Sequence, residues 1–238
     1  VFDWLGFSLE GFSFIFKPWT ILTYMFIHDL AGIFHLLWNM LFLYWFGLIV
    51  EDFIGRSKTF PIYILGGIGG ALFALILNTI FHFSNAMPLI GASGAVYGIM
   101  LAAVTIAPNY SFHLLFLGPI QIKYIATFKI IMDILSISEF ENMGGHFCHL
   151  GGALMGFFYV YYLRKGTDIG LFIQKLSVNI DFWNKPKTTM KIVYKQQTNV
   201  SPTQKQQKLD EILDKISKSG YESLSKEEKE FLFKASKD

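Results

Sequence analysis

Charged residues are scarce in this chain of 238 residues, where they make up 16% of the sequence. Soluble domains usually carry about 25%. The shortage is confined to one region, because residues 1–163 hold five of the 20 Lys and Arg and eight of the 18 Asp and Glu. Hydrophobic residues reach 53% of the chain. This composition argues against an ordinary soluble domain and predicts an apolar body followed by a hydrophilic tail.

Other shortages exclude particular kinds of site. The one cysteine, Cys148, excludes an internal disulfide. There is no basic patch interleaved with aromatic residues and no Gly-rich phosphate loop, so we expect no nucleic acid partner. The sequence has no HExxH motif, and we expect neither a metal nor another cofactor. The sequence around Ser93 does not match the G-x-S-x-G elbow of α/β-hydrolases, because Ala95 stands where that motif requires glycine.

Long apolar runs predict the fold. The first, 31–50, is 20 residues long, which gives about 30 Å of helix and matches the hydrocarbon core of a bilayer. Four further runs are predicted to span the membrane: 60–81, 91–107, 120–137 and 146–163. The segment 1–27 is rich in aromatic residues without such a run, and reads equally well as an interfacial segment or an aromatic loop. We therefore predict an all-α, polytopic membrane helix bundle over residues 1–165.

Lysine and arginine in the loops orient this bundle. The loop 51–59 carries two, the loop 108–123 carries one, and the tail begins with two, whereas the loops on the other side carry none. The positive-inside rule then places the first three segments in the cytoplasm and the start of the chain outside. Because the chain begins with Val1 rather than Met, we expect a preceding helix that would make six in the parent protein.

The hydrophilic tail divides into two predicted parts. Residues 166–208 are expected to form a flexible linker, since much of this stretch is rich in Lys, Gln and Thr. Residues 209–238 have apolar residues at helical spacing. Gly220 suits the end of a first helix, and Ser223 or Ser225 suits the N-cap of a second. We expect a small cytoplasmic helical hairpin with no chemistry of its own.

Four polar residues fall at one depth of the predicted bundle. His35 and Asn39 lie near the outer end of the first span, Ser93 lies in the first turn of the third, and His149 lies within two turns of the start of the fifth. All three of these spans enter from the outside. Ionisable residues within membrane spans are functional candidates by default. We therefore expect these side chains to meet in the outer part of the membrane.

These residue types suit nucleophilic catalysis. The Ser93 hydroxyl needs an adjacent base, and His149 can take its proton and return it to a leaving amine. His35 and Asn39 are spaced i, i+4 and project from one helix face as hydrogen-bond donors for an oxyanion. Tyr97, one turn beyond the serine, is expected to stack on His149. No carboxylate is expected in the outer layer, which predicts a Ser-His dyad rather than a triad.

Small residues surround the candidate nucleophile. Gly91, Ala92 and Gly94 are expected to leave room for the backbone of a substrate. Gly152 and Gly156 follow His149 at spacings of three and seven, which predicts a small-residue stripe for close packing against the third span.

Other polar residues in the apolar region are expected to have structural roles. Lys129 and Asp133 are spaced i, i+4 and are expected to pair. His146 is interpreted as a polar residue at the mouth of the fifth span rather than a second base. Cys148 is expected to be a small buried hydrophobic residue.

The three motifs resemble those of one known family, the rhomboid intramembrane serine proteases. Gly91-Ala92-Ser93-Gly94 resembles their GxSG signature, and the segment from His149 to Gly156 is similar to their His-x-x-Gly-x-x-x-Gly pattern. His35-x-x-x-Asn39 is similar to their HxxxN motif. The motifs occur in the family's order within about 17–165, and the tail resembles those of bacterial, Bacteroidetes-type members.

The resemblance implies a six-helix rhomboid core in which Ser93 and His149 form the dyad. It also implies that Tyr97 stacks on the histidine and that His35 and Asn39 form the oxyanion hole. By this resemblance, the helix expected before Val1 would correspond to the family's first transmembrane helix. The Trp-Arg pair that some members carry in their first loop is not found in this sequence. His28 lies seven residues before His35, where many members have five, and its role stays unassigned.

Two classes of function remain open. The first is an intramembrane serine endopeptidase that cuts transmembrane proteins near their outer ends. The second is a non-proteolytic rhomboid-like protein that binds membrane clients. Ser93 and His149 favour the enzyme, because a binding protein needs neither. The expected surroundings are transmembrane protein substrates and the lipid bilayer, in the cell membrane, with the tail in the cytoplasm; no oligomeric state is predicted.

Overall fold

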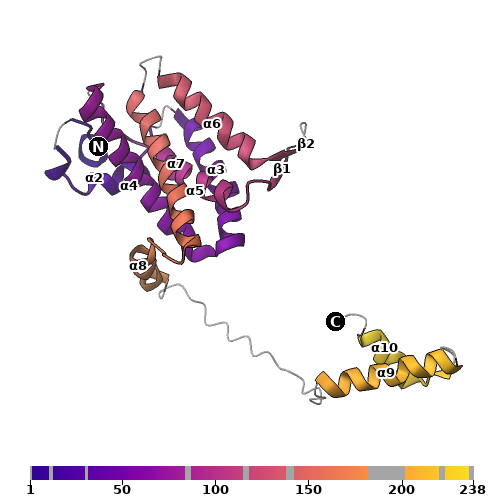
Figure 1. Cartoon of the computed structure of the whole chain (residues 1–238). Coiled ribbons are helices and arrows are strands. Elements are labelled where there is room, and N and C mark those ends of the chain that lie inside the picture. Colours follow the sequence, from indigo (N-terminus) through magenta and orange to yellow (C-terminus); the bar gives the residue numbers. More distant parts are fainter. Residues whose placement is uncertain are drawn as a thin grey trace. The chain divides into compact units, whose positions relative to one another are not determined.

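The computed structural model divides the chain into two compact units, Val1–Lys185 and Pro186–Asp238, and we describe each by itself (Figure 1). The structure describes residues 2–10, 13–29, 32–83, 87–114, 118–137, 142–181, 202–219 and 223–235.

Five long helices build the larger unit: α3 (Ile33–Ile54), α4 (Arg56–Phe81), α5 (Ser93–Ile106), α6 (Ile122–Ile137) and α7 (Met143–Arg164). They take the places of the five predicted spans. The helix α5 is central, since it packs against each of the other four, and nine of its 14 residues are buried (Figure 1). The bundle therefore holds the residues that follow Ser93 at its core.

Two of the described helices, α3 and α4, are long and apolar enough to cross a membrane by length and composition, and α5 is a shorter apolar helix. The other two long helices do not meet these criteria of length and composition. The helix α6 has only 16 residues, and α7 carries five glycines, two histidines and a terminal arginine. The predicted number of five spans is therefore not confirmed. Large apolar side chains nevertheless cover the outside of the bundle, among them Phe34, Trp38, Ile76, Ile80, Phe128, Ile134, Phe157 and Phe158.

Glycines bring α4, α5 and α7 into backbone contact. A β-carbon on Gly152 of α7 would stand 2.8 Å from the carbonyl carbon of Gly94 in α5, and one turn further Gly156 meets Gly98 in the same way. On α4, a β-carbon on Gly66 would stand 3.1 Å from the α-carbon of Gly98. Helices that approach this closely gain van der Waals contact and have no room for larger side chains. The predicted stripe of Gly152 and Gly156 is confirmed.

The described part of the N-terminal segment forms short helical turns: α1 (Phe2–Leu5), η1 (Ser13–Ile15), α2 (Thr20–Thr23) and η2 (Tyr24–Phe26). It packs under the chain that leads into α5. Phe7 and Leu89 exchange two backbone hydrogen bonds of 2.9 and 2.7 Å, and the Gly91 N–H donates to the Tyr24 carbonyl at 3.0 Å. Phe7 is fully buried. The segment thus fixes the entry to the helix that begins at Ser93.

The stretch 108–123, expected to be a linker, contains an antiparallel hairpin of β1 (Ser111–Leu114) and β2 (Gly118–Gln121). Ser111 pairs with Gln121, and His113 pairs with Pro119. Phe112 packs its ring against Phe46 of α3, with ring centroids 5.5 Å apart, and this contact holds the hairpin on the bundle.

A helix, α8 (Leu171–Asp181), occupies part of the predicted linker 166–208, and this corrects that prediction. Asp168, which precedes it, forms an ion pair with Lys58 in the first turn of α4 and accepts a hydrogen bond of 2.9 Å from the Tyr159 hydroxyl. Lys58 also donates to Gln174 at 3.0 Å. These contacts attach α8 to the end of the bundle where α4 begins (Figure 1).

The smaller unit is a helical hairpin of α9 (Pro202–Ser219) and α10 (Lys226–Ala235), so the first helix begins seven residues earlier than expected. Ser225 caps α10: its hydroxyl accepts from the Glu228 N–H at 3.2 Å, and its own N–H donates to the Glu228 carboxylate at 2.7 Å. This reciprocal pair is a capping box. It confirms Ser225 as the cap, while Gly220 lies outside the described residues.

Candidate active site

Ser93 is the first residue of α5, directly after a turn that requires glycine. Gly91 has a φ of +114°, a backbone conformation that residues with a β-carbon rarely adopt. The space where a Gly91 side chain would stand is open: Ser93 Oγ lies 3.9 Å and His35 Nε2 lies 4.0 Å from it. The serine hydroxyl and the imidazole of His35 thus border the same empty position.

His149 contacts the serine directly. Its Nε2 lies 2.7 Å from Ser93 Oγ, within hydrogen-bond distance. The ring of Tyr97 stacks on the imidazole, with ring centroids 4.4 Å apart and an interplanar angle of 10°. The side chain of His149 is only 13% exposed. The contact joins the first turn of α5 to the second turn of α7, and the stacking expected from the spacing is present.

A carboxylate lies beside the histidine, which corrects the prediction that the outer layer holds none. His149 Nδ1 lies 2.9 Å from Asp133 Oδ1. His146 Nδ1 lies 2.8 Å from the same oxygen, and the Tyr97 hydroxyl donates to the other oxygen, Oδ2. Asp133 is 4% exposed. Three side chains from α5 and α7 therefore converge on one buried carboxyl group of α6.

The expected pair of Lys129 and Asp133 is not formed. Lys129 instead places its ammonium group 5.7 Å from the centroid of the Tyr97 ring. The carboxylate is directed into the bundle, toward Tyr97 and the two histidines. The two side chains share a helix face by spacing, but Asp133 finds better-placed donors on neighbouring helices.

His28 links the candidate oxyanion residues to the backbone beside the serine. Its Nε2 accepts from the Ala92 N–H at 3.4 Å and lies 3.4 Å from the Asn39 side-chain nitrogen. Asn39 is buried. Because both neighbours of Nε2 are N–H donors, this nitrogen carries no proton. Burial, and then the neighbouring His35, lower the pKa of His28, which agrees with a neutral ring.

Gly94 does not face this space, contrary to expectation. A β-carbon on Gly94 would stand 2.6 Å from Cys148 Sγ and 3.4 Å from the Tyr24 hydroxyl. Cys148 itself is buried and lies 3.5 Å from that hydroxyl. One residue along a helix turns the side-chain direction by about 100°. Gly91 borders the open side of Ser93, and Gly94 packs against α7.

Among the described residues, one group has the composition of a metal site. The ligand atoms of Asp133, His146 and His149 all lie within 4.8 Å of one another. In this structure Nδ1 of each histidine lies at hydrogen-bond distance from Asp133 Oδ1.

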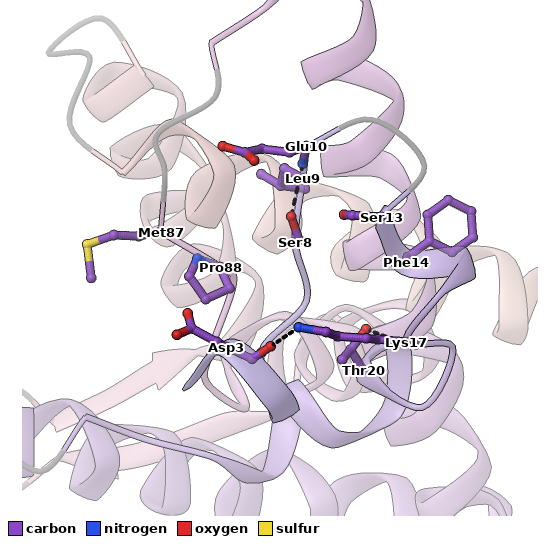
Figure 2. A pocket seen from close by; sticks show the side chains of 11 residues that line it. Asp3, Ser8, Leu9, Glu10, Ser13, Phe14, Lys17, Thr20, Met87 and Pro88 are labelled. Atoms are coloured by element: carbon purple, nitrogen blue, oxygen red, sulfur yellow. Dashed lines mark hydrogen bonds between the residues drawn. The ribbon is translucent and has the colours of Figure 1, made fainter. Parts of the chain in front are cut away.

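A cavity of about 280 Å³ lies elsewhere, between the N-terminal segment and residues 87–88. Figure 2 shows it lined by Asp3, Glu10, Phe14 and Pro88, with Lys17 reaching across to donate to the Asp3 carbonyl at 2.7 Å. It shares no residue with the cluster around Ser93. The cavity belongs to the packing of the N-terminal segment.

Comparisons with known proteins show which family the chain resembles. A model of the Rhomboid domain matches residues 16–166, and a family of unknown function, DUF6576, matches residues 195–238. Rhomboid-like protein 12, mitochondrial, of Arabidopsis thaliana is 31% identical over 159 residues, 62% of this chain and 47% of that protein. Rhomboid protease GluP of Bacillus subtilis is 31% identical over 141 residues, 59% of this chain and 25% of that protein.

A further relative bears the name of an inactive protein. Inactive Rhomboid-like protein 8 of Arabidopsis thaliana is 29% identical over 143 residues, 59% of this chain and 38% of that protein. The chain thus spans between a quarter and about half of the length of these three relatives. The domain match covers more than half of the chain and contains Ser93, His149, His35 and Asn39. This chain therefore belongs to the rhomboid family of membrane proteins.

Proposed function

We propose that this protein is an intramembrane serine endopeptidase that cleaves transmembrane proteins with Ser93 as nucleophile and His149 as base. The observation that carries the proposal is the distance of 2.7 Å between His149 Nε2 and Ser93 Oγ. A serine hydroxyl becomes an effective nucleophile when a neighbouring base takes its proton. The relative named Rhomboid protease GluP adds support from the same family.

The proposed reaction has two stages. Ser93 Oγ attacks the peptide carbonyl carbon while its proton passes to His149 Nε2. The carbon–nitrogen bond then breaks, and the same proton passes to the leaving amine, which leaves an ester on Ser93. Water attacks this ester and gives a proton to His149. That proton returns to Ser93 Oγ as the carboxylic acid product departs.

The negatively charged oxygen of the first stage needs hydrogen-bond donors. His35 borders the open position in front of Gly91 together with Ser93 Oγ, so its imidazole is placed to donate there. Asn39 is held nearby by its contact with His28, which also binds the Ala92 N–H. We propose His35 and Asn39 as the oxyanion donors, with a backbone N–H near Ser93 as a third.

The length of α5 supports a site below the membrane surface. Arg164, at the end of α7, donates to the Thr105 carbonyl at 2.6 Å, so α5 and α7 end at the same level. The 14 residues of α5 rise about 21 Å, less than a hydrocarbon core about 30 Å thick. If both helices end at the cytoplasmic surface, Ser93 lies inside the membrane below the outer surface. Substrates would be cut near their outer ends.

The proposed location follows from loop charge. The positive-inside rule places the end of α7, with Arg164 and Lys165, in the cytoplasm. We therefore propose a multi-pass protein of the cell membrane whose C-terminal unit lies in the cytoplasm. Bilayer lipids would cover the apolar outer side chains of the bundle.

The second candidate function is that of a non-proteolytic rhomboid-like protein that binds membrane clients. The relative named Inactive Rhomboid-like protein 8 is the observation that favours this alternative. Covalent labelling separates the two. A fluorophosphonate reacts with an activated serine, so the protein in detergent should form an adduct at Ser93 that mass spectrometry locates. The His149→Ala variant should form none. A folded protein that stays unlabelled, or is labelled equally without His149, would support the client-binding alternative.

A further inference from the structure

The geometry points to Asp133 as a positioning residue that holds His149 in the tautomer able to accept the Ser93 proton, with His146 holding Asp133 in turn. This inference rests on the proposed function of Ser93 and His149. The inference goes beyond a Ser-His dyad, because Asp133 orients His149 and His146 in turn holds Asp133.

The argument begins with the proton on His149. A neutral imidazole carries one N–H, so one ring nitrogen donates and the other accepts. Nε2 faces Ser93 Oγ at 2.7 Å and must be the acceptor if it is to take the hydroxyl proton. The N–H must then be on Nδ1, which lies 2.9 Å from Asp133 Oδ1. An ionised carboxylate only accepts hydrogen bonds, so it selects this tautomer.

The same contact supports the reaction after proton transfer. His149 then carries a positive charge in a site where its side chain is 13% exposed. A carboxylate at hydrogen-bond distance stabilises such an imidazolium far more there than in water. Asp133 touches neither the serine nor the open position in front of Gly91, and therefore acts through His149.

Asp133 is itself held firmly. The Tyr97 hydroxyl donates to Oδ2, while the His146 and His149 rings share Oδ1. The carboxyl group of Asp133 is therefore held by side chains from two neighbouring helices. Tyr97 makes a second contribution, because its ring stacks on His149 while its hydroxyl holds Asp133. One residue of α5 thus fixes both members of the pair.

A purely structural alternative must be tested against this inference. Asp133 also joins α6 to α5 and α7, and ionisable groups inside a membrane are sometimes retained for helix association. That role needs no particular tautomer of His149. The two accounts therefore differ in the protonation of one nitrogen, which can be measured whether or not the protein cleaves a substrate.

The first measurement is histidine-selective ¹⁵N NMR of the protein in lipid nanodiscs, with the His149→Gln spectrum used for assignment. We expect the Nδ1–H tautomer of His149 in the wild type, and a shift toward the Nε2–H tautomer in Asp133→Asn. The asparagine side chain has nearly the size of aspartate but can offer an N–H to Nδ1. An Nε2–H tautomer in the wild type, or no change in the variant, would overturn the inference independently of any activity.

The second measurement is kinetic, on a transmembrane substrate. Asp133→Asn should lower kcat by about 10²-fold or more, since general-base catalysis contributes on that order, while KM stays within about threefold. The matched pair is His146→Asn and His146→Ala. The amide nitrogen of Asn can take the place of Nδ1 and donate to Asp133, so the kcat of His146→Asn should stay near that of the wild type. The kcat of His146→Ala should fall about tenfold, because this variant loses about one hydrogen bond to a charged group.

Folding is checked in each variant by the melting temperature, so that a misfolded protein is not mistaken for an inactive one. A folded Asp133→Asn protein with wild-type kcat, or equal losses in both His146 variants, would contradict the assigned roles. If the wild type cleaves nothing, the proposed function fails, and the tautomer of His149 still decides the role of Asp133.

Discussion

A β-carbon on Gly156 of α7 would stand 2.7 Å from the carbonyl carbon of Gly98 in α5. Neither backbone can move aside without displacing a helix, because α5 also packs against α3, α4 and α6. The same two helices carry His149 and Ser93, so their separation also sets the distance between base and nucleophile. Packing and chemistry therefore depend on one helix contact.

The first prediction concerns this contact. Gly156→Ala should destabilise the bundle by about 2 kcal/mol or more, as overpacked cores do, and should also lower activity. Gly47→Ala is the matched control, because Gly47 is likewise buried in a helix but its nearest neighbour would be Thr59 Cγ2 at 3.9 Å. The control should be neutral or slightly stabilising.

The measurement can use the protein's own thiol. Cys148 is the one cysteine of the chain and is buried. A thiol-reactive dye therefore reports unfolding in detergent as temperature rises. Equal melting temperatures for the two glycine variants would contradict the close approach of α5 and α7.

The second prediction separates a chemical asparagine from a structural one. Asn39→Ala should lower kcat by about 10²-fold with little change in melting temperature, as the loss of one oxyanion donor does. Asn78→Ala should lower the melting temperature and leave the kcat of the folded protein nearly unchanged. Asn78 donates to the Leu9 carbonyl at 2.7 Å, and its loss leaves that carbonyl unpaired at a cost of about 1–3 kcal/mol. Folded Asn39→Ala protein that retains wild-type kcat would exclude it from the oxyanion site.

The third prediction concerns His28, whose ring accepts from Ala92 and contacts Asn39. His28→Gln keeps an acceptor at the end of the side chain, whereas His28→Leu does not. We expect kcat to fall about tenfold in the leucine variant, the effect of losing about one hydrogen bond, and much less in the glutamine variant. His113 of β1 is exposed and serves as a control position, where the same substitution should have no effect. Equal effects at both positions would remove His28 from the site.

The fourth prediction is a pH dependence. Partial burial raises the pKa of Asp168, but hydrogen bonds from Lys58, Tyr159 and the Gly170 N–H outweigh it, so the pKa lies below its usual value. A lowered pKa means that the contacts add stability fully above about pH 4, the pKa of the unfolded chain, and lose it as pH falls through the folded value.

Asp168→Asn should therefore melt below the wild type at pH 7, with a difference that shrinks as the pH falls below about 4. The melting temperatures of both proteins, measured across this range, provide the test. A difference that stays constant into acid would show that the charge of Asp168 does not hold α8 on the bundle.

The sequence predicted the helices well, because long apolar runs and loop charges constrain a membrane bundle strongly. It also brought Ser93, His149 and His35 to one region, where the structure places Ser93 Oγ within 2.7 Å of His149 Nε2. Asp133 was missed for a local reason. Lys129, one turn earlier, supplied an obvious partner, although Asp133 lies four residues from the end of α6 and so belongs to the outer layer by the same reasoning used for His149.

Other misses have similar causes. Gly94 is adjacent to Ser93 in sequence, yet the rotation of a helix turns it toward Cys148. The helix α8 is short and lies in a hydrophilic tail, and its attachment comes from Asp168 and Lys58 rather than from helix propensity. Contacts between distant segments, such as these, leave no periodic pattern in the sequence.

The measurement that tests the central claim most directly is cleavage of a model transmembrane substrate in proteoliposomes that contain this protein. We predict that the wild type cuts the substrate near its outer end, as mass spectrometry of the products would show. Ser93→Ala and His149→Ala, folded to the same melting temperature, should give no product. Cleavage that persists in Ser93→Ala would contradict the account.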